Sequence, residues 1–386
     1  MIDKNSPALY LLPFILDFMM GGISIAVPLL AIMLNASPLT LGILGFSPGV
    51  AYISLCLVFG KLSEVWHRKN LLSLGLFLYT LSSLILCFSS RIYQLYLSML
   101  LIGIGAAMFW PTLEAWIAER EEKKPLARKM GIFNTSWSLG QALGPLAGGM
   151  LFAISLRLPF YLVFLVGLFS FFILLKGIPG DDLSRRSRSI DNSSPSSSIN
   201  SSYSFYVNIS RIANFTLWFS LGVIRYIFPK LGTNLGISSS FLGLLMFALF
   251  SSQTLIFYGL GIFRNWQYTI YPLIFFQVLA LSGLAIIFFS SSFVLFLLAF
   301  LLIGAGIGMT HSSSLFHSVN TVLQKGPRAA VHEIFLAAGG LSGPLIGGII
   351  AQRFSLRTPY LVAFLIIGGG IVVEILIKIR ASSCKN

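Results

Sequence analysis

Residues 101–108, LIGIGAAM, recur 201 positions later as LIGAGIGM at residues 302–309. Two further pairs keep nearly the same spacing. GPLAGG at residues 144–149 matches GPLIGG at 343–348, and LRLP at 156–159 matches LRTP at 356–359. Three collinear matches at one period indicate an internal duplication, in which each copy forms one structural unit. The chain is therefore predicted to contain two homologous halves.

Long apolar segments fill both halves. Hydrophobic residues make up 56% of the chain, charged residues make up 10%, and the mean hydropathy is +0.87. Apolar segments of about 20 residues can cross a bilayer, where each must satisfy its own backbone hydrogen bonds as a helix. We therefore predict an all-α membrane protein with two bundles of six transmembrane helices. The predicted spans are residues 9–34, 39–60, 70–90, 93–118, 130–154, 158–177, 206–229, 239–262, 268–289, 292–316, 329–351 and 358–379.

The duplication also predicts the domain organisation. Residues 1–177 form the first bundle and residues 206–386 the second, and residues 178–205 join them. This segment is rich in Ser, Asn and Arg and buries too little apolar surface to fold, so we expect a flexible cytoplasmic linker. Because an even number of spans separates the copies, both halves should have the same orientation in the membrane. Parallel six-helix halves with a site near the midplane are a transporter design.

The positive charge of the chain follows its topology. Lys and Arg number 26 against 12 Asp and Glu, an excess that by itself is compatible with nucleic-acid binding. With the N-terminus inside, however, 20 of the 26 basic residues fall in the cytoplasmic segments or near the cytoplasmic ends of the spans. Basic loops resist translocation, so this bias predicts a multi-pass protein of the cell membrane with both termini in the cytoplasm. We therefore expect contact with membrane lipids and no nucleic-acid partner.

Other chemistries find little support in the sequence. The three cysteines, Cys56, Cys87 and Cys384, form no CxxC pair, so neither a disulfide nor a metal site is expected. Residues 45–49 spell G-x-S-x-G, but they lie inside a predicted span and not on the strand-to-helix turn that a hydrolase needs. No P-loop for ATP occurs. We predict a protein that is not an enzyme and that needs no cofactor.

The loop between the second and third spans resembles a motif of the major facilitator superfamily. Residues 60–69, GKLSEVWHRK, are similar to the family pattern G-x-L-a-D-r-x-G-R-[KR], with Glu64 in place of Asp and His67 in place of the second Gly. The resemblance implies that the glycine permits a close approach, the acid pairs with a neighbouring helix end, and the basic pair anchors the cytoplasmic side. The residues concerned are Gly60, Glu64, Arg68 and Lys69.

The fifth span is similar to the antiporter signature of the same superfamily. Three of its glycines recur every four residues and form a smooth face for close helix packing, and its proline permits a bend. The resemblance implies export by antiport. An alternative interpretation is a small-residue packing seam, which does not show direction and which Gly339, Gly343 and Gly347 repeat in the eleventh span. The signature residues are Gly131, Gly140, Gly144, Pro145, Gly148 and Gly149.

Two features depart from the drug-exporter branch of the family. Met99 stands where that branch carries an Arg in the fourth span, and Asp17 lies two residues farther from Pro28 than in the exporter pattern. These departures keep uptake by symport open as an alternative to export.

Acidic side chains inside predicted spans are candidates for proton transfer. An ionisable group in a span costs about 3 kcal/mol on insertion scales, so such groups usually have a function. Asp17 lies in the first span and Glu114 in the fourth, and by the resemblance these two spans line the pathway. Two carboxylates facing one cavity would suit a proton carrier. The alternative for each is a structural pair with a basic helix end.

Further polar and aromatic residues are candidates for the substrate pathway. His311 occupies the duplicated position of Trp110, and either ring can contact substrate or simply pack. Arg225 can bind an anion or extend to the membrane interface. Asn134 and Gln141 are seven residues apart and share a helix face, which suits either cavity lining or interhelical bonds.

The combined prediction is a monomeric secondary transporter that moves a small organic molecule by alternating access. The favoured function is proton-coupled export, with protons entering through Asp17, Glu114 or both. Uptake of a metabolite or sugar is the first alternative. A non-transporting receptor or lipid-handling protein on the same scaffold is the second.

Overall fold

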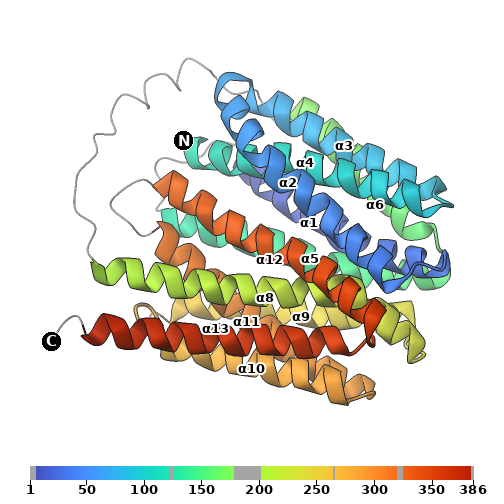
Figure 1. Ribbon diagram of the computed structural model, residues 1–386. Coiled ribbons are helices and arrows are strands. Elements are labelled where there is room, and N and C mark those ends of the chain that lie inside the picture. Colours follow the sequence, from blue (N-terminus) through green and yellow to red (C-terminus); the bar gives the residue numbers. More distant parts are fainter. Residues whose placement is uncertain (1–5, 121–125, 178–200, 264–265, 320–324, 384–386) are drawn as a thin grey trace. The chain divides into compact units, whose positions relative to one another are not determined.

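The computed structural model describes residues 6–120, 126–177, 201–263, 266–319 and 325–383 (Figure 1). These residues form twelve long helices and no strand, so the predicted all-α fold is confirmed. Residues 178–200, most of the predicted linker, lie outside the described ranges. The helices are α1 (Ser6–Met33), α2 (Pro38–Val65), α3 (Arg68–Phe88), α4 (Ile92–Arg120), α5 (Leu126–Ile154), α6 (Leu158–Gly177), α8 (Ser201–Asn234), α9 (Ser239–Ile262), α10 (Tyr271–Phe289), α11 (Phe293–Val319), α12 (Lys325–Arg353) and α13 (Thr358–Ser383).

Eleven helices of the described chain are long and apolar enough to cross a membrane. The exception, α5, contains the five glycines of the antiporter-like signature together with Asn134 and Gln141, and these residues lower its hydropathy. Most helices extend beyond the predicted spans, and the extensions of α2 and α8 at their predicted cytoplasmic ends are the clearest. α2 continues to Val65 and α8 begins at Ser201.

The chain divides into two compact units. Unit 1 contains residues 1–36, 47–194 and 238–247, and unit 2 contains residues 37–46, 195–237 and 248–386. In unit 1, α1 packs against α4, α5 and α6, while α3 packs against α4 and α6. In unit 2, α8 packs against α11, α12 and α13, while α10 packs against α11 and α13. The same pairs of helices form in both units, as a duplicated sequence requires.

The repeated G-x-G of residues 101–108 and 302–309 explains how one helix contacts two neighbours. A Cβ on Gly105 would lie 2.8 Å from the carbonyl oxygen of Gly75 on α3, and one on Gly103 would lie 2.8 Å from the Cβ of Ala51 on α2. In the second copy, a Cβ on Gly306 would lie 2.8 Å from the Cβ of Ala280 on α10. Side chains at these positions would separate the helices, so small residues set the packing distance.

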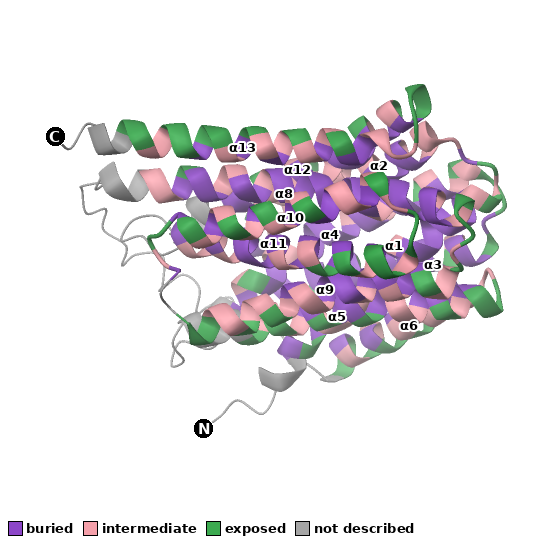
Figure 2. Ribbon diagram, turned by 90° about the horizontal axis from the view of Figure 1, so that it is seen from below, coloured by how far each residue is buried: buried purple, intermediate pink, exposed green. Residues whose placement is uncertain are grey.

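Burial differs strongly among the helices. In their most apolar segments, 72% of residues in α1 and 78% in α8 are buried, against 28% in α13. Figure 2 shows exposed residues along the length of α13. α1 and α8 are therefore the innermost helices of their units, and polar groups on them are shielded from lipid.

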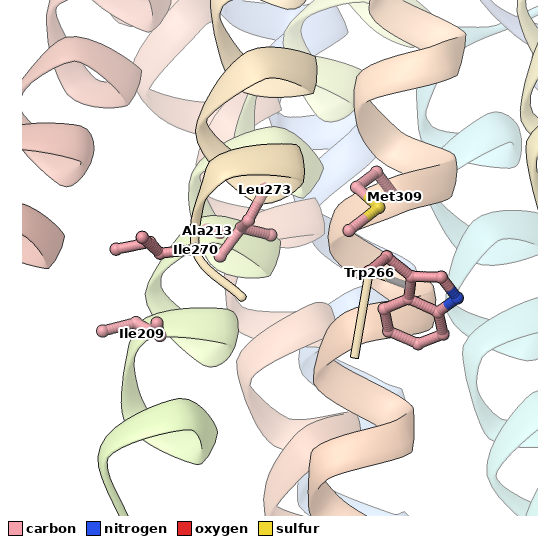
Figure 3. Packing of buried hydrophobic residues seen from close by; sticks show 6 residues of the cluster. All are labelled: Ile209, Ala213, Trp266, Ile270, Leu273 and Met309. Carbon is pink, nitrogen blue, oxygen red and sulfur yellow. The ribbon is translucent and has the colours of Figure 1, made fainter. Parts of the chain in front are cut away.

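Unit 2 has an apolar cluster that joins the α9–α10 connection to α8 and α11 (Figure 3). Trp266 donates from Nε1 to the carbonyl oxygen of Leu260 at 3.1 Å, which fixes the indole at the end of α9. Its ring also lies 5.2 Å from that of Phe316 on α11. Burial of these side chains stabilises the connection. The buried members are Ile209, Ala213, Trp266, Ile270, Leu273 and Met309.

The arginines of the duplicated L-R-x-P motif bind helix ends. Arg157 donates from Nη1 to the carbonyl oxygen of Leu86 near the end of α3, at 3.1 Å. Arg357 donates from Nη1 to the carbonyl oxygen of Phe288 near the end of α10, at 2.7 Å, and from Nη2 to Ser291 Oγ, also at 2.7 Å. The last carbonyls of a helix lack intrahelical partners, and a cation there also interacts favourably with the helix dipole.

We expect Arg357→Ala to lower the free energy of unfolding by about 1–3 kcal/mol, because it leaves these carbonyls without their charged donor. Thermal unfolding of the detergent-solubilised protein, compared with that of the wild type, measures the loss. Arg353→Ala on the same side of the membrane is the control, because it removes a cation without removing a described cap. Equal stability of Arg357→Ala and Arg353→Ala would contradict the capping role.

Candidate functional site

The glycines of the antiporter-like signature pack α5 directly against α1. A Cβ on Gly144 would lie 2.9 Å from both the Cα of Gly21 and the backbone nitrogen of Gly22. A Cβ on Gly148 would lie 2.9 Å from the carbonyl oxygen of Gly22. Gly140 similarly faces the backbone of Phe14, and Gly131 lies in the part of α5 whose surroundings are outside the described residues. The four-residue spacing thus brings two backbones together, and the partner is α1.

The other residues of the signature contact different elements of unit 1. A Cβ on Gly149 would lie 2.9 Å from the Cα of Gly243 on α9. Pro145 fits against Gly21, where a Cβ would lie 2.6 Å from the Cδ of Pro145. Gly339, Gly343 and Gly347 make the equivalent seam between α12 and α8 in unit 2. The pattern is therefore a packing device in both units, as the alternative interpretation of the sequence had it.

Asp17 lies on α1, one turn before Gly21 of this seam, and is 6% exposed. It is close enough to the buried Tyr79 of α3 for its charge to act on the phenol. Glu114, by contrast, is exposed on α4. The two carboxylates thus have different environments, and only Asp17 has the shielded position that a buried proton site requires.

Trp110 packs at the contact between α4 and α5. Its ring centroid lies 5.8 Å from that of Phe109 and 6.1 Å from that of Phe133, in edge-to-face geometry. The indole is half-buried. It therefore belongs to an aromatic group that retains one open side.

Asn134 and Gln141 differ in their contacts. The side-chain oxygen Oδ1 of Asn134 accepts a hydrogen bond from Trp137 Nε1 at 3.0 Å. Gln141 is 8% exposed, and among the described residues its Oε1 has no hydrogen-bond donor. A buried amide oxygen without a donor is unfavourable, so Gln141 is the better candidate to bind a polar group of a ligand.

The candidates of unit 2 occupy aromatic surroundings. The guanidinium of Arg225 lies 5.1 Å above the ring of Phe250 on α9, which makes a cation–π contact. The guanidinium of Arg225 therefore packs on a buried ring. Extension of this side chain to the membrane interface, one of the two predictions from the sequence, would not make this contact. His311 is 5% exposed, with the rings of Trp218 and Phe257 at 6.1 Å and 5.5 Å.

The loop motif is ordered mainly through its basic residues. Lys69 donates to the carbonyl oxygen of Leu175 at the end of α6, at 2.7 Å, and Arg68 is 4% exposed. Glu64 is exposed at the end of α2. At Gly60, no described atom lies within 4 Å of where a Cβ would be. Among the described residues, therefore, no neighbouring helix approaches Gly60 closely.

The structure adds a buried polar pair that the sequence reading missed. Glu374 on α13 and Gln277 on α10 are each 0% exposed, and Gln277 donates from Nε2 to Glu374 Oε2 at 2.8 Å. One turn farther, the ammonium of Lys378 lies 4.3 Å from the ring centroid of Tyr271. Glu374 was visible as an acid inside the last predicted span. Its partner is 97 residues away, and no local pattern joins them.

We expect Glu374→Ala to lower the free energy of unfolding by about 1–3 kcal/mol, because the buried amide of Gln277 loses its acceptor. Glu374→Gln keeps the shape and an acceptor oxygen, so a loss under about 1 kcal/mol is expected. Thermal unfolding in detergent compares the two variants. If both variants lose equal stability, the interaction depends on the charge of Glu374 and not on the hydrogen bond.

Twelve long helices in two units with the same helix pairings, and with ionisable groups inside their spans, define the class of a membrane transporter. The chain belongs to the Major Facilitator Superfamily, whose family model matches residues 9–331. Proteins of this family are transporters and not enzymes. The chain is therefore a multi-pass membrane protein that moves small molecules.

Several relatives share this sequence pattern. Multidrug resistance protein 2 of Bacillus subtilis is 23% identical over 366 residues, covering 91% of this chain and 91% of the relative. An MFS-type transporter of Methanocaldococcus jannaschii is 26% identical over 237 residues, which cover 58% of this chain and only 61% of the relative. The quinolone resistance protein NorA of Staphylococcus aureus is 26% identical over 166 residues, covering 42% of this chain and 43% of the relative.

Solved structures share the fold at low sequence identity. A bacterial homologue of the human lysosomal transporter Spinster has a TM-score of 0.76 at 14% identity and covers 98% of this chain and 97% of its own. The nucleoside transporter NupG has a TM-score of 0.72 at 13% identity and covers 97% of this chain and 98% of its own. These likenesses concern the fold alone.

Proposed function

We propose that the protein exports a small organic molecule in exchange for protons, by alternating access, as a monomer in the cell membrane with both termini in the cytoplasm. The observation that carries the proposal is the buried carboxylate of Asp17 on the innermost helix of unit 1, beside the α1–α5 glycine seam. A carboxylate in that position can bind a proton and release it again while the side chain stays inside the membrane.

The direction and cargo of the proposal rest on the relatives. The one that aligns with most of the chain is a multidrug resistance protein, and another is a quinolone resistance protein. A lining of aromatic and weakly polar side chains such as Trp110 and Gln141 suits a planar, amphipathic molecule. We therefore propose aromatic antibacterial or dye-like molecules as the cargo.

Purified protein in liposomes tests this function with norfloxacin, a quinolone, and ethidium as probes. An imposed pH gradient should drive either probe against its own concentration gradient. Addition of the probe should in turn move protons in the direction opposite to the probe, and a pH-sensitive dye trapped in the liposomes measures this movement. Probe movement without proton movement would contradict proton coupling. Binding of the probe without any movement would instead favour a receptor.

Uptake by symport is the second candidate, and Met99 favours it. This residue is 1% exposed on α4, where the drug-exporter branch has an arginine. The same liposome experiment separates the two candidates, because symport moves protons and probe in the same direction.

A further inference from the structure

Two helices of unit 2, α11 and α12, bring four polar side chains together, and of these only His311 was a predicted site residue. His332 on α12 is 0% exposed, and its Nδ1 lies 2.8 Å from Ser314 Oγ on α11. Its other nitrogen, Nε2, lies 3.8 Å from Oε1 of Glu333. The ring of His311 on α11 is 5.2 Å from that of His332. We name His311, Ser314, His332 and Glu333 the histidine cluster.

The cluster lies in a shielded part of unit 2 that α8 completes. Trp218 on α8 covers His311 at 6.1 Å between ring centroids. One turn earlier on α8, Asn214 is 0% exposed, and both of its amide atoms lack a hydrogen-bond partner among the described residues. On the next turn, Arg211 donates from Nη2 to Ser318 Oγ on α11 at 3.4 Å. The innermost helix of unit 2 thus presents polar groups to α11 over three turns.

The charged and titratable groups that face His332 are few. On α11 they are His311 and, nearer the end of the helix, His317, which stacks on Tyr206 at 5.4 Å. On α8 the charge of Arg211 acts on the ring of His332, and on α12 the neighbour is Glu333. α9 and α10 carry no charged residue, and Glu374 of α13 binds Gln277. Burial opposes a positive charge on His332 most strongly, and positive charge on His311 or Arg211 opposes it as well. Among the described residues, the acid beside the ring that favours the charge is Glu333.

We propose that the histidine cluster is a proton-binding site of unit 2, with His332 as the group that accepts the proton. A proton from water forms a bond to the free ring nitrogen of His332. The ring then donates from Nδ1 to Ser314 Oγ and directs its Nε2 proton toward Glu333. Release reverses these steps and returns the proton to water. Because two imidazolium rings 5.2 Å apart repel each other, the cluster holds one proton at a time. That this proton is exchanged for cargo rests on the proposed function, but the binding site itself does not.

The chain offers a direct test, because it contains four histidines in all. In protein labelled with ¹⁵N at histidine, each ring gives its own signals, and single substitutions assign them. We expect the His332 ring to take up a proton as the pH is lowered while the protein stays folded. Glu333→Gln should lower its proton affinity by about tenfold or more, because the carboxylate that favours the charged ring is removed. His317→Asn is the matched control, since it removes a buried histidine whose ring stacks on Tyr206 and lies outside the cluster, and it should leave the His332 titration unchanged.

Two results would overturn the site. Either the His332 ring stays neutral over the whole range in which the protein is folded, or Glu333→Gln leaves its titration unchanged. If Glu333→Gln fails to fold, Ser314→Ala gives a second measurement, because losing the Nδ1 partner should also shift the titration.

Transport separates the coupling role from the site. With norfloxacin on both sides of the liposome membrane, exchange needs no net proton movement, whereas accumulation driven by a pH gradient does. His332→Asn keeps a polar atom near Ser314 and should lose gradient-driven accumulation by about tenfold, within the usual range of coupling energies, while exchange continues. Unchanged accumulation would overturn the coupling role. If wild-type protein moves no norfloxacin, the proposed function fails, and the NMR titration still decides whether the site exists.

Discussion

Gly144→Ala is expected to lower the free energy of unfolding by about 1–3 kcal/mol and to remove most transport activity. The added Cβ would meet backbone atoms only, with the Cα of Gly21 and the nitrogen of Gly22 both at 2.9 Å. Backbone cannot move aside as a flexible side chain can, so α1 and α5 must separate. Because α1 also carries Asp17, the separation displaces the candidate proton site.

A glycine without neighbours provides the control for Gly144. Gly369 on α13 is exposed, and no described atom lies within 4 Å of its ideal Cβ position. Alanine stabilises a helix by about 1 kcal/mol relative to glycine. Gly369→Ala should therefore leave transport unchanged and leave the free energy of unfolding equal or slightly higher. Thermal unfolding in detergent and norfloxacin transport in liposomes measure both variants. If the two variants behave alike, the loss at Gly144 does not come from packing.

The fold could be predicted from the sequence because the patterns that specify it are local and occur twice. The length of each apolar segment predicts a span, and the match of residues 101–108 with 302–309 predicts two alike units. The structure then explains the repeat, since Gly103 and Gly105 let α4 contact both α2 and α3. Helix packing in a bilayer depends on such small residues, which is why a short motif persists in both copies.

The residues that contact each candidate side chain could not be predicted in the same way. The spacing of Gly140, Gly144 and Gly148 predicts a smooth face but not that α1 covers it. Glu374 and His332 lie inside predicted spans and were available as candidates. Their significance depends on Gln277 and Ser314, which are distant in sequence. Burial likewise separates Asp17 from Glu114, although both are acids within predicted spans.

The loop motif contains one residue, Gly60, whose expected role has no counterpart among the described contacts. The pattern assigns Gly60 a close approach, yet α2 runs through that position to Val65, and no described atom lies near the missing Cβ. Arg68 and Lys69 are the residues of the motif that make described contacts or are buried. Conformational freedom at Gly60 therefore has no visible use in this conformation.

Asp17→Asn is expected to lower pH-gradient-driven norfloxacin accumulation by about tenfold or more, while exchange of norfloxacin across the membrane continues. The amide keeps the size of the side chain but cannot carry a proton at physiological pH, so only the coupled step is lost. Asp17→Glu keeps an acid on α1 and should retain part of the coupling. Glu114→Gln should have a smaller effect, because Glu114 is exposed and lacks the shielded surroundings of Asp17.

The pattern across these variants locates the proton site. Loss of coupling in Asp17→Asn alone would place it in unit 1, and loss in both Asp17→Asn and His332→Asn would require a proton site in each unit. A duplicated fold permits the second result, since α1 and α8 make equivalent helix contacts and each carries a buried polar residue, Asp17 and Asn214. Full coupling in Asp17→Asn would show that this carboxylate carries no coupled proton, and the assignment of Asp17 as proton carrier would then be wrong.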